Sequence, residues 1–335
     1  MATMLEVAKR AGVSKATVSR VLSGNGYVSQ ETKDRVFKAV AESGYRPNLL
    51  ARNLATKTTQ TLGLVVTNTL YHGVYFSELL YHVARMTEDK GRQLILADGK
   101  HSAQEEREAI QYLLDLRCDA IIIYPRFLTV DEMDEIVENH SQPIMVLNRR
   151  LRRHASHCVW SDQKASAMRV VERLIALGHR DIAYIRTDRE VTLHFSVQGR
   201  FDSFMTCCKS NGVEPRVFVT DEGKNNISKV VTQLLSSDHM PTAIACQEDG
   251  IAIPLLFQLE RNGFTIPNDI SIIGYDDSTY ARDLGLTTIR QTPVEMAHEA
   301  ARMTLALIDK QPLDEPFKTF PAQLIVRSTT ARLRH

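Results

Sequence analysis

Residues 4–22 carry the pattern that most constrains this chain. The segment 14–22 places Val18 and Val21 three residues apart, the spacing with which a helix buries one face. An earlier helical segment, 4–11, ends at Gly12, and the small residues near its end allow a neighbouring helix to approach closely. Two short helices that meet across so tight a turn predict a helix-turn-helix.

A third helical pattern follows, with Ser29 placed as its N-cap and Gly44 just past its end. We expect the three helices to close a small core. Its expected members are Leu5, Val7, Val18, Val21, Val36 and Val40, and Phe37 and Ala41 of the third helix are expected to face inward as well.

The basic charge of the chain is concentrated in the same region. Residues 1–60 contain ten Lys or Arg and four Asp or Glu, a net charge of +6 on a chain whose total is +1. The second helix presents Lys15 and Arg20 on its outward face, with Ala16 and Thr17 beside them. A basic helix-turn-helix is typical of a protein that meets the phosphate backbone of DNA.

The motifs at residues 5–14, 17–22, 44–48 and 50–54 together resemble the headpiece of the LacI/GalR family of bacterial transcription regulators. The resemblance implies a repressor that binds a near-palindromic, double-stranded operator as a homodimer. Residues 1–150 further resemble repressors of β-glucoside operons. The implied DNA contacts are Ser14, Lys15, Ala16, Thr17, Ser19, Arg20, Asn25, Asn48, Arg52 and Leu54.

The expected domains are a helix-turn-helix at 1–47, a hinge helix and linker at 48–60, and a body at 61–335. An isolated helix as short as the hinge is marginal in water, so it should fold only against a partner. In the family, the hinge pairs with its dimer mate in the minor groove. There the position matching Leu54 is a wedge between base pairs.

From residue 61 onward, short apolar runs alternate with helical patterns, which predicts parallel sheets covered on both faces. Two such sets predict two α/β lobes, and the family resemblance implies a periplasmic-binding-protein-like body. Lobe 1 is expected near 61–159 and 291–319, and lobe 2 near 160–290 and 320–335. Crossovers between the lobes are expected near 158–162, 288–292 and 318–322.

Ligands of open α/β sheets bind beyond the carboxyl ends of the strands, so the effector contacts are expected there. Polar residues at these ends suit a polyhydroxylated ligand, a sugar or glycoside, although such residues also cap helices. The expected contacts are Tyr75, Phe76, Asn148, Arg149, Ser196, Gln247 and Asp276. Many sugar-responsive relatives have an Arg where this chain has Ser196. The alternative to a sugar effector is therefore a non-sugar effector or none.

Other classes of protein fit the sequence less well. The chain lacks the His-Glu-x-x-His, Gly-x-Ser-x-Gly and P-loop motifs, which argues against an enzyme, and no cofactor or metal is expected. A transport binding protein would fit the body, but the N-terminus does not resemble an export signal. No apolar run of about 18 residues is present, and five cysteines show no metal spacing. These features predict a cytoplasmic protein, associated with the nucleoid when bound to its operator.

Overall fold

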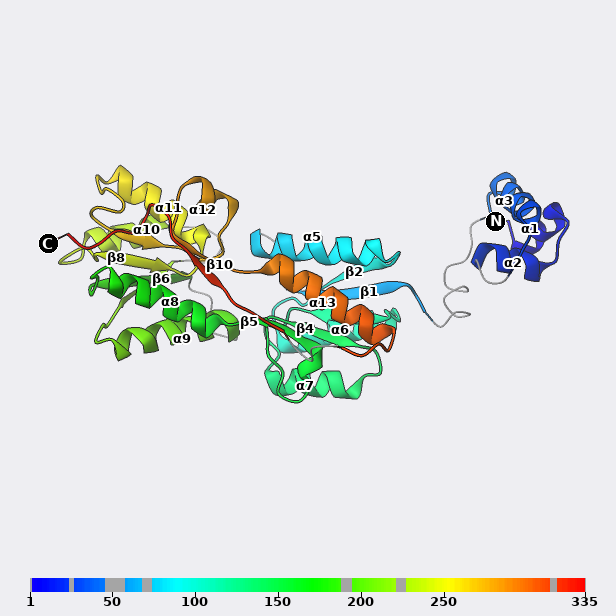
Figure 1. Ribbon diagram of the computed structural model, residues 1–335, viewed down its shortest axis with the longest axis horizontal. Helices are drawn as coiled ribbons and strands as arrows, with labels where there is room; N and C mark the ends of the chain where they lie inside the picture. The colour runs from blue at the N-terminus through cyan, green and yellow to red at the C-terminus, as the bar shows by residue number, and fades with distance from the viewer. Residues whose placement is uncertain are drawn as a thin grey trace. The chain divides into compact units, whose positions relative to one another are not determined.

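The structure is a computed structural model that describes residues 2–23, 27–45, 58–67, 74–187, 195–220, 227–313 and 318–334, with the backbone alone at 23, 195 and 196. The chain divides into two compact units, Met1–Thr59 and Gln60–His335 (Figure 1). We call the first unit the headpiece and the second the body, and describe each by itself.

The headpiece contains the three expected helices, α1 (Met4–Ala11), α2 (Lys15–Ser23) and α3 (Gln30–Ser43). Local chemistry fixes their ends. Thr3 and Glu6 form a capping box at the start of α1, and Gly12 ends it in the left-handed conformation at φ 65°. Ser29 caps α3 by accepting a hydrogen bond from the Thr32 N–H, and Gly44 ends that helix at φ 64°.

Some side chains that were expected in the core of the headpiece are exposed. Val7, Val18 and Val36 are fully buried, and Ala8, Ala11, Val21 and Ala39 complete the core. The inward placement of Leu5 and Phe37 was wrong, because their side chains are 54% and 52% exposed. Ala41 is also exposed. The inward face of α1 follows positions 4, 7, 8 and 11, and that of α3 follows 36, 39 and 40, so these three residues fall outside it.

Lobe 1 of the body is built on a six-stranded sheet with the order β11-β5-β4-β3-β1-β2, and all of its strand pairs are parallel. Helices α5 and α13 cover one face, and α6 and α7 cover the other. Gly63 in β1 allows α6 to pack closely, because a Cβ there would lie 2.6 Å from the Leu113 side chain. The bounds are β1 Thr61–Val66, α5 Val74–Asp89, β2 Gln93–Asp98, α6 Ala103–Asp115, β3 Ala120–Ile123, α7 Val130–Asn139, β4 Ile144–Leu147, β5 Cys158–Ser161, α13 Pro293–Ile308 and β11 Lys318–Phe320.

Lobe 2 has a four-stranded parallel sheet with the order β7-β6-β8-β9. One face packs against α8 and α9, and the other against α10 and α11. The expected parallel α/β architecture of both lobes is therefore confirmed. The bounds are α8 Gln163–Ala176, β6 Ile182–Thr187, α9 Phe195–Ser210, β7 Arg216–Thr220, α10 Ile227–Leu235, β8 Ala243–Cys246, α11 Asp249–Arg261, β9 Ser271–Ile273 and α12 Thr279–Asp283.

The chain passes between the lobes in three places (Figure 1). It leaves the lobe 1 sheet after β5 to enter α8, and it returns from β10 (Thr288–Arg290) to α13. It then leaves β11 for β12 (Gln323–Ile325), which pairs antiparallel with β10. These segments coincide with the expected crossovers.

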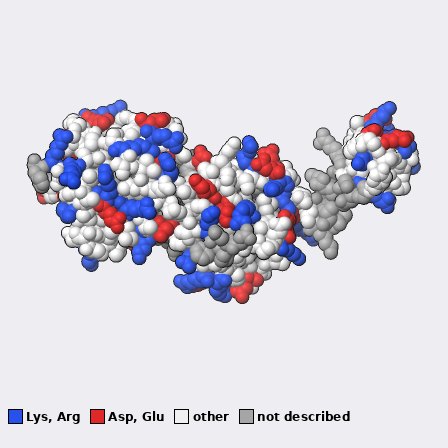
Figure 2. Space-filling view, in the orientation of Figure 1, with Lys and Arg blue, Asp and Glu red and all other residues white. Residues whose placement is uncertain are grey.

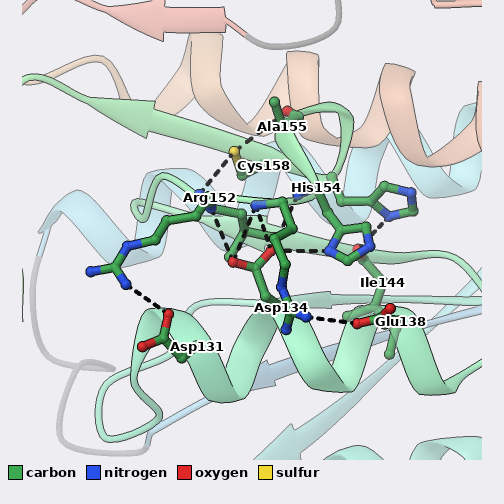
Figure 3. A network of polar contacts seen from close by, with 11 residues as sticks. Asp131, Asp134, Glu138, Ile144, Arg152, His154, Ala155 and Cys158 are labelled. Atoms are coloured by element: carbon green, nitrogen blue, oxygen red, sulfur yellow. Dashed lines mark hydrogen bonds and ion pairs between the residues drawn. The ribbon is translucent and has the colours of Figure 1, made fainter.

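The turn that leads into β5 is held by one buried carboxylate (Figure 3). Asp134, on α7, accepts hydrogen bonds from the backbone N–H groups of Arg152, Arg153 and His154 at 3.0, 3.1 and 3.2 Å, and its Oδ1 lies 3.0 Å from the His154 Nδ1. Burial alone would raise the pKa of Asp134, but these hydrogen bonds outweigh burial and lower it. The short 3-10 helix η2 (Ala155–His157) then connects the turn to β5.

Within the described part of the chain, no helix is both long and apolar enough to span a membrane. The described residues also contain no group of His, Cys, Asp or Glu that could hold a metal ion.

Candidate functional site

Helix α2 presents a polar and basic face. Ser14 caps the helix, since its Oγ accepts a hydrogen bond from the Thr17 N–H at 3.0 Å and lies 2.9 Å from the Thr17 hydroxyl. Lys15, Ala16, Ser19 and Arg20 are exposed, and Thr17 is half-buried. Because Val18 and Val21 anchor the opposite face in the core, these side chains lie on the face of α2 that points away from the core.

The remaining predicted DNA contacts lie outside the described residues. They are Asn25, Asn48, Arg52 and Leu54. On the face shown in Figure 2, Lys and Arg are interspersed with Asp and Glu over the body. The mixed charge on this face of the body contrasts with residues 1–60, whose net charge is +6.

A group of side chains from both lobes, Tyr75, Tyr124, Asn148, Tyr275 and Asp276, forms what we call the inter-lobe cluster. In lobe 1, the Asn148 Nδ2 donates a hydrogen bond to the Tyr124 hydroxyl at 2.5 Å, and the Tyr75 and Tyr124 rings meet edge to face at 6.2 Å. Burial raises the pKa of Tyr75 well above its usual value, with further contributions from Tyr124 and from Asp276 and Tyr275 of lobe 2. Asp276 and Tyr275 of lobe 2 therefore lie close enough to Tyr75 of lobe 1 to interact with it electrostatically.

In lobe 2, Asp276 is connected to the crossovers by side-chain hydrogen bonds. Its Oδ1 accepts a hydrogen bond from the Gln291 Nε2 at 2.5 Å, and Gln291 in turn lies 3.4 Å from the Gln163 Nε2. The Tyr275 hydroxyl donates to the Gln163 Oε1 at 2.9 Å. Gln163 begins α8 and Gln291 follows β10, so two crossovers are connected directly to the inter-lobe cluster.

Backbone conformation also distinguishes the cluster. Asn148 has φ 53° and Asp276 has φ 113°, values that residues with a Cβ rarely adopt. The Oδ1 of Asn148 is buried and has no hydrogen-bond partner. Strained backbone and an unsatisfied buried acceptor are both unfavourable for stability, and such features concentrate at binding sites.

Three predicted effector contacts lie outside the inter-lobe cluster. Phe76 is 3% exposed and packs in the lobe 1 core with residues of α5 and α13. Arg149 is 7% exposed, its Nη2 donates to the Pro125 carbonyl at 3.3 Å, and burial lowers its pKa to about 10 although Glu106 opposes the shift. Gln247 is 4% exposed and holds the end of β6, where its Nε2 donates to the Thr187 hydroxyl at 3.2 Å.

The other predicted contacts differ in outcome. Tyr75 and Asn148 both contact Tyr124, and Tyr75 interacts electrostatically with Asp276. The side chain of Ser196 lies outside the described atoms. Sequence reasoning missed Tyr124, Gln163 and Gln291. Tyr124 directly follows β3, so the strand-end rule could have found it, and the two glutamines lie at the expected crossovers.

Comparison with known proteins identifies the family. Residues 3–48 match the lacI family of bacterial regulatory proteins, and residues 171–330 match a periplasmic binding protein-like domain. The chain is 53% identical over 334 residues to the HTH-type transcriptional regulator AscG of Escherichia coli strain K12, with 98% of each chain covered. The chain belongs to the lacI family of bacterial regulatory proteins. It is therefore a helix-turn-helix transcription regulator and not an enzyme.

Solved structures agree with this assignment. The chain is similar to a sugar-binding transcriptional regulator of the LacI family from Escherichia coli, in complex with phosphate, at 44% identity and a TM-score of 0.73, covering 82% of this chain and 99% of that one. The lac repressor dimer bound to operator matches with a TM-score of 0.84 over 98% of this chain and 99% of that one. Because its identity is 24%, this second likeness concerns the fold alone.

Proposed function

We propose that this regulator is a homodimeric repressor of a carbohydrate operon, one for β-glucosides, and that a sugar or glycoside bound between the lobes sets its affinity for the operator. The observation that carries the effector part is the inter-lobe cluster, to which lobe 1 contributes Asn148 and lobe 2 contributes Asp276. Hydrogen-bonding side chains beside aromatic rings suit a sugar, since a sugar ring has hydroxyls on its edge and an apolar face. The similar Escherichia coli regulator named as sugar-binding supports this ligand class.

In the proposed complex, the first turns of α2 enter the major groove, and Lys15, Ala16 and Arg20 set the half-site sequence. The exposure of all three side chains supports this role. Residues 48–60 act as the hinge, and Leu54 is the wedge in the minor groove. On this proposal, the chain is associated with the nucleoid whenever it is bound to its operator.

Within lobes 1 and 2, we assign Asn148 and Asp276 to the ligand hydroxyls and Tyr75 to the apolar face of the ring. Asp276 is suited to its role because Gln291 fixes the orientation of its carboxylate. The dimer is assigned to contacts between bodies. Leu96 on the edge strand β2 and Tyr81 on α5 support this, since they are 41% and 55% exposed.

The decisive experiment measures binding of the purified chain to a random duplex library, followed by titration of the selected duplex with arbutin, salicin and cellobiose. We expect one near-palindromic sequence to be selected, and at least one of these sugars to release it without being consumed. Equal affinity for all duplexes would contradict the regulator's proposed mode of reading DNA. Retention of the duplex in the presence of every sugar would contradict the proposed effector class.

A further inference from the structure

Arg200 of α9 is a buried cation that the proposed function does not yet use. It lies one helical turn after Ser196, the position at which the family resemblance implies a clamping Arg. Only 8% of Arg200 is exposed. A buried guanidinium is costly unless its charge and its N–H groups are satisfied, so its surroundings indicate what it does.

The guanidinium of Arg200 faces the inter-lobe cluster. Its central carbon lies 3.6 Å from the centroid of the Tyr275 ring, in a cation–π contact. Arg200 also interacts electrostatically with Tyr275 and Asp276. Tyr275 and Asp276 are consecutive residues, so the cation is held beside the carboxylate that we assign to the effector.

One N–H group of this guanidinium lacks a hydrogen-bond acceptor. The Nε of Arg200 is buried and has no hydrogen-bond partner. Leaving a buried donor unpaired costs about 1–3 kcal/mol, and more for a charged group, so such atoms are rare in folded proteins. Across the inter-lobe cluster, the Asn148 Oδ1 is a buried acceptor in the same condition. A bound molecule that accepts from Arg200 and donates to Asn148 would satisfy both atoms.

The charges near Arg200 decide between a neutral and an anionic ligand. An anion would pair with the guanidinium, but Asp276 lies beside it, and Glu248 and Asp249 also interact electrostatically with Asp276. An anionic group beside the guanidinium would also meet the Asp276 carboxyl group, which disfavours it. A hydroxyl fits better, because it accepts a hydrogen bond from a donor and donates one to a carboxylate at the same time.

We propose that Arg200 is an effector contact, which donates a hydrogen bond from its Nε to a sugar hydroxyl while the same hydroxyl donates to Asp276. This inference rests on the proposed function and deepens it, since it names a neutral polyol as the ligand. It also supplies, from the next turn of α9, the guanidinium that Ser196 does not provide. Tyr275 is then a positioning residue that holds the guanidinium over its ring.

The test compares sugar binding by the full-length parent, Arg200→Met and Arg200→Lys. Titration calorimetry with salicin and cellobiose gives the dissociation constants, and operator binding without sugar is measured in parallel. We expect Arg200→Met to weaken sugar binding about tenfold or more, since a hydrogen bond to a charged group is lost. Operator affinity should stay at the parent level, because Arg200 lies in the body and not in the headpiece.

A matched control is available in lobe 2. Arg186 on β6 also lies over an aromatic ring, 4.8 Å from the Phe201 centroid, and it is only partly buried. Arg186→Met removes a comparable cation–π contact outside the inter-lobe cluster. We expect this variant to bind salicin as the parent does. Equal weakening by Arg186→Met and Arg200→Met would show that loss of either cation disturbs lobe 2 generally, which would overturn the inference.

Monodeoxy analogues of salicin separate a direct contact from a structural role. In the parent, one analogue should bind about tenfold more weakly than salicin, because it lacks the hydroxyl between Arg200 and Asp276. In Arg200→Lys, which keeps the charge but has no Nε–H donor, the hydroxyl still donates to Asp276, so the ratio between the dissociation constants of the analogue and salicin should be smaller than in the parent but above one. This ratio does not depend on the stability of the variant, so it remains informative if Arg200→Met does not fold.

The possible failures are distinguishable. If Arg200→Met binds salicin within twofold of the parent, or if every analogue shows the same loss in parent and Arg200→Lys, the inference is overturned and the proposed function stands. If the parent binds neither salicin nor cellobiose, the proposed effector class fails and this inference fails with it.

Discussion

Two consecutive aspartates show how partners decide what a residue does. Asp277 is paired with two arginines, accepting from the Arg290 Nε at 2.6 Å and the Arg327 Nη2 at 2.5 Å. Its charge is therefore compensated within the fold, and it joins β10 to the segment that follows β12. Asp276 accepts instead from the neutral Gln291, and burial raises its pKa to about 8. Asp277 is therefore suited to a structural role, and Asp276 is suited to binding a ligand.

The raised pKa of Asp276 predicts a pH dependence of stability. Between the unfolded value near 3.9 and the folded value of about 8, the folded chain holds a proton that the unfolded chain releases, so the free energy of unfolding falls as pH rises. The contribution has a ceiling of about 1.4 kcal/mol per pH unit and ends above pH 8. Urea denaturation of the parent and Asp276→Asn at pH 5, 6.5, 8 and 9 measures it. We expect the difference in free energy of unfolding between the parent and Asp276→Asn to change in disfavour of the parent as pH rises to 8. The same dependence on pH in both proteins would contradict a raised pKa of Asp276.

Among the proposed DNA contacts, Arg20 is the residue that we expect to contribute most to sequence specificity. A guanidinium can pair with guanine through two hydrogen bonds, so Arg20→Ala should cost about 1–3 kcal/mol of operator binding and relax one position of each half-site. Lys38→Ala on α3 is the control, because it removes one charge from an exposed side chain paired with Glu42. Fluorescence anisotropy on the operator and its single-base variants measures both. Loss of affinity by Arg20→Ala that is the same for all duplexes would show that Arg20 meets phosphates alone.

At the scale of elements, the turn before β5 allows the contributions of a buried and an exposed carboxylate to stability to be compared. Asp134→Ala leaves three backbone N–H groups without their acceptor, and we expect the free energy of unfolding to fall by about 3 kcal/mol. Asp131 lies on the same helix and pairs with Arg152 at 2.9 Å, but both side chains are about 70% exposed. Asp131→Ala should therefore change stability by less than about 1 kcal/mol. Similar losses in the two variants, measured by urea denaturation, would contradict this account.

The regular elements were predictable because their signals are local. The caps at Ser14, Ser29 and Gly44 depend on residues within three or four positions, and the structure has them where the sequence indicates. The inward faces were less predictable. Leu5 and Phe37 are exposed because the register of α1 and α3 against each other, and not apolarity alone, decides which side is buried.

The site was predictable only in part, for a related reason. The strand-end rule selected Asn148 and Asp276, which belong to the inter-lobe cluster, but it also selected Arg149 and Gln247, which bind neighbouring backbone and side chains. The side chain of a residue at a strand end can point toward the other lobe or toward its own lobe. The sequence does not reveal which direction it takes. Arg200 could not be found in this way, because it lies on a helix and reaches the site only through packing on Tyr275.

For the whole molecule, we predict a dimer. A near-palindromic operator needs two headpieces, and exposed apolar residues on lobe 1, Val74, Tyr81 and Leu96, provide surface for a second copy. Residues 326–335 contain one leucine and three arginines, which does not fit the leucine heptads of a coiled coil. Sedimentation velocity should therefore give a mass near twice 37.8 kDa without DNA. A stable tetramer under these conditions would contradict the assignment.

The last prediction concerns how the effector reaches the operator. Asp276 is connected through Gln291 and Gln163 to two of the three crossovers, so a ligand that binds the carboxylate also acts on segments that connect the lobes. A coupling free energy of about 1–3 kcal/mol would change operator affinity 5- to 150-fold. Asp276→Ala removes the ligand contact and leaves α2 untouched. We expect this variant to bind the operator as the parent does and to stay bound when the parent's effector is added. Release at the parent's effector concentration would show that Asp276 does not contact the effector, even though the family assignment would stand.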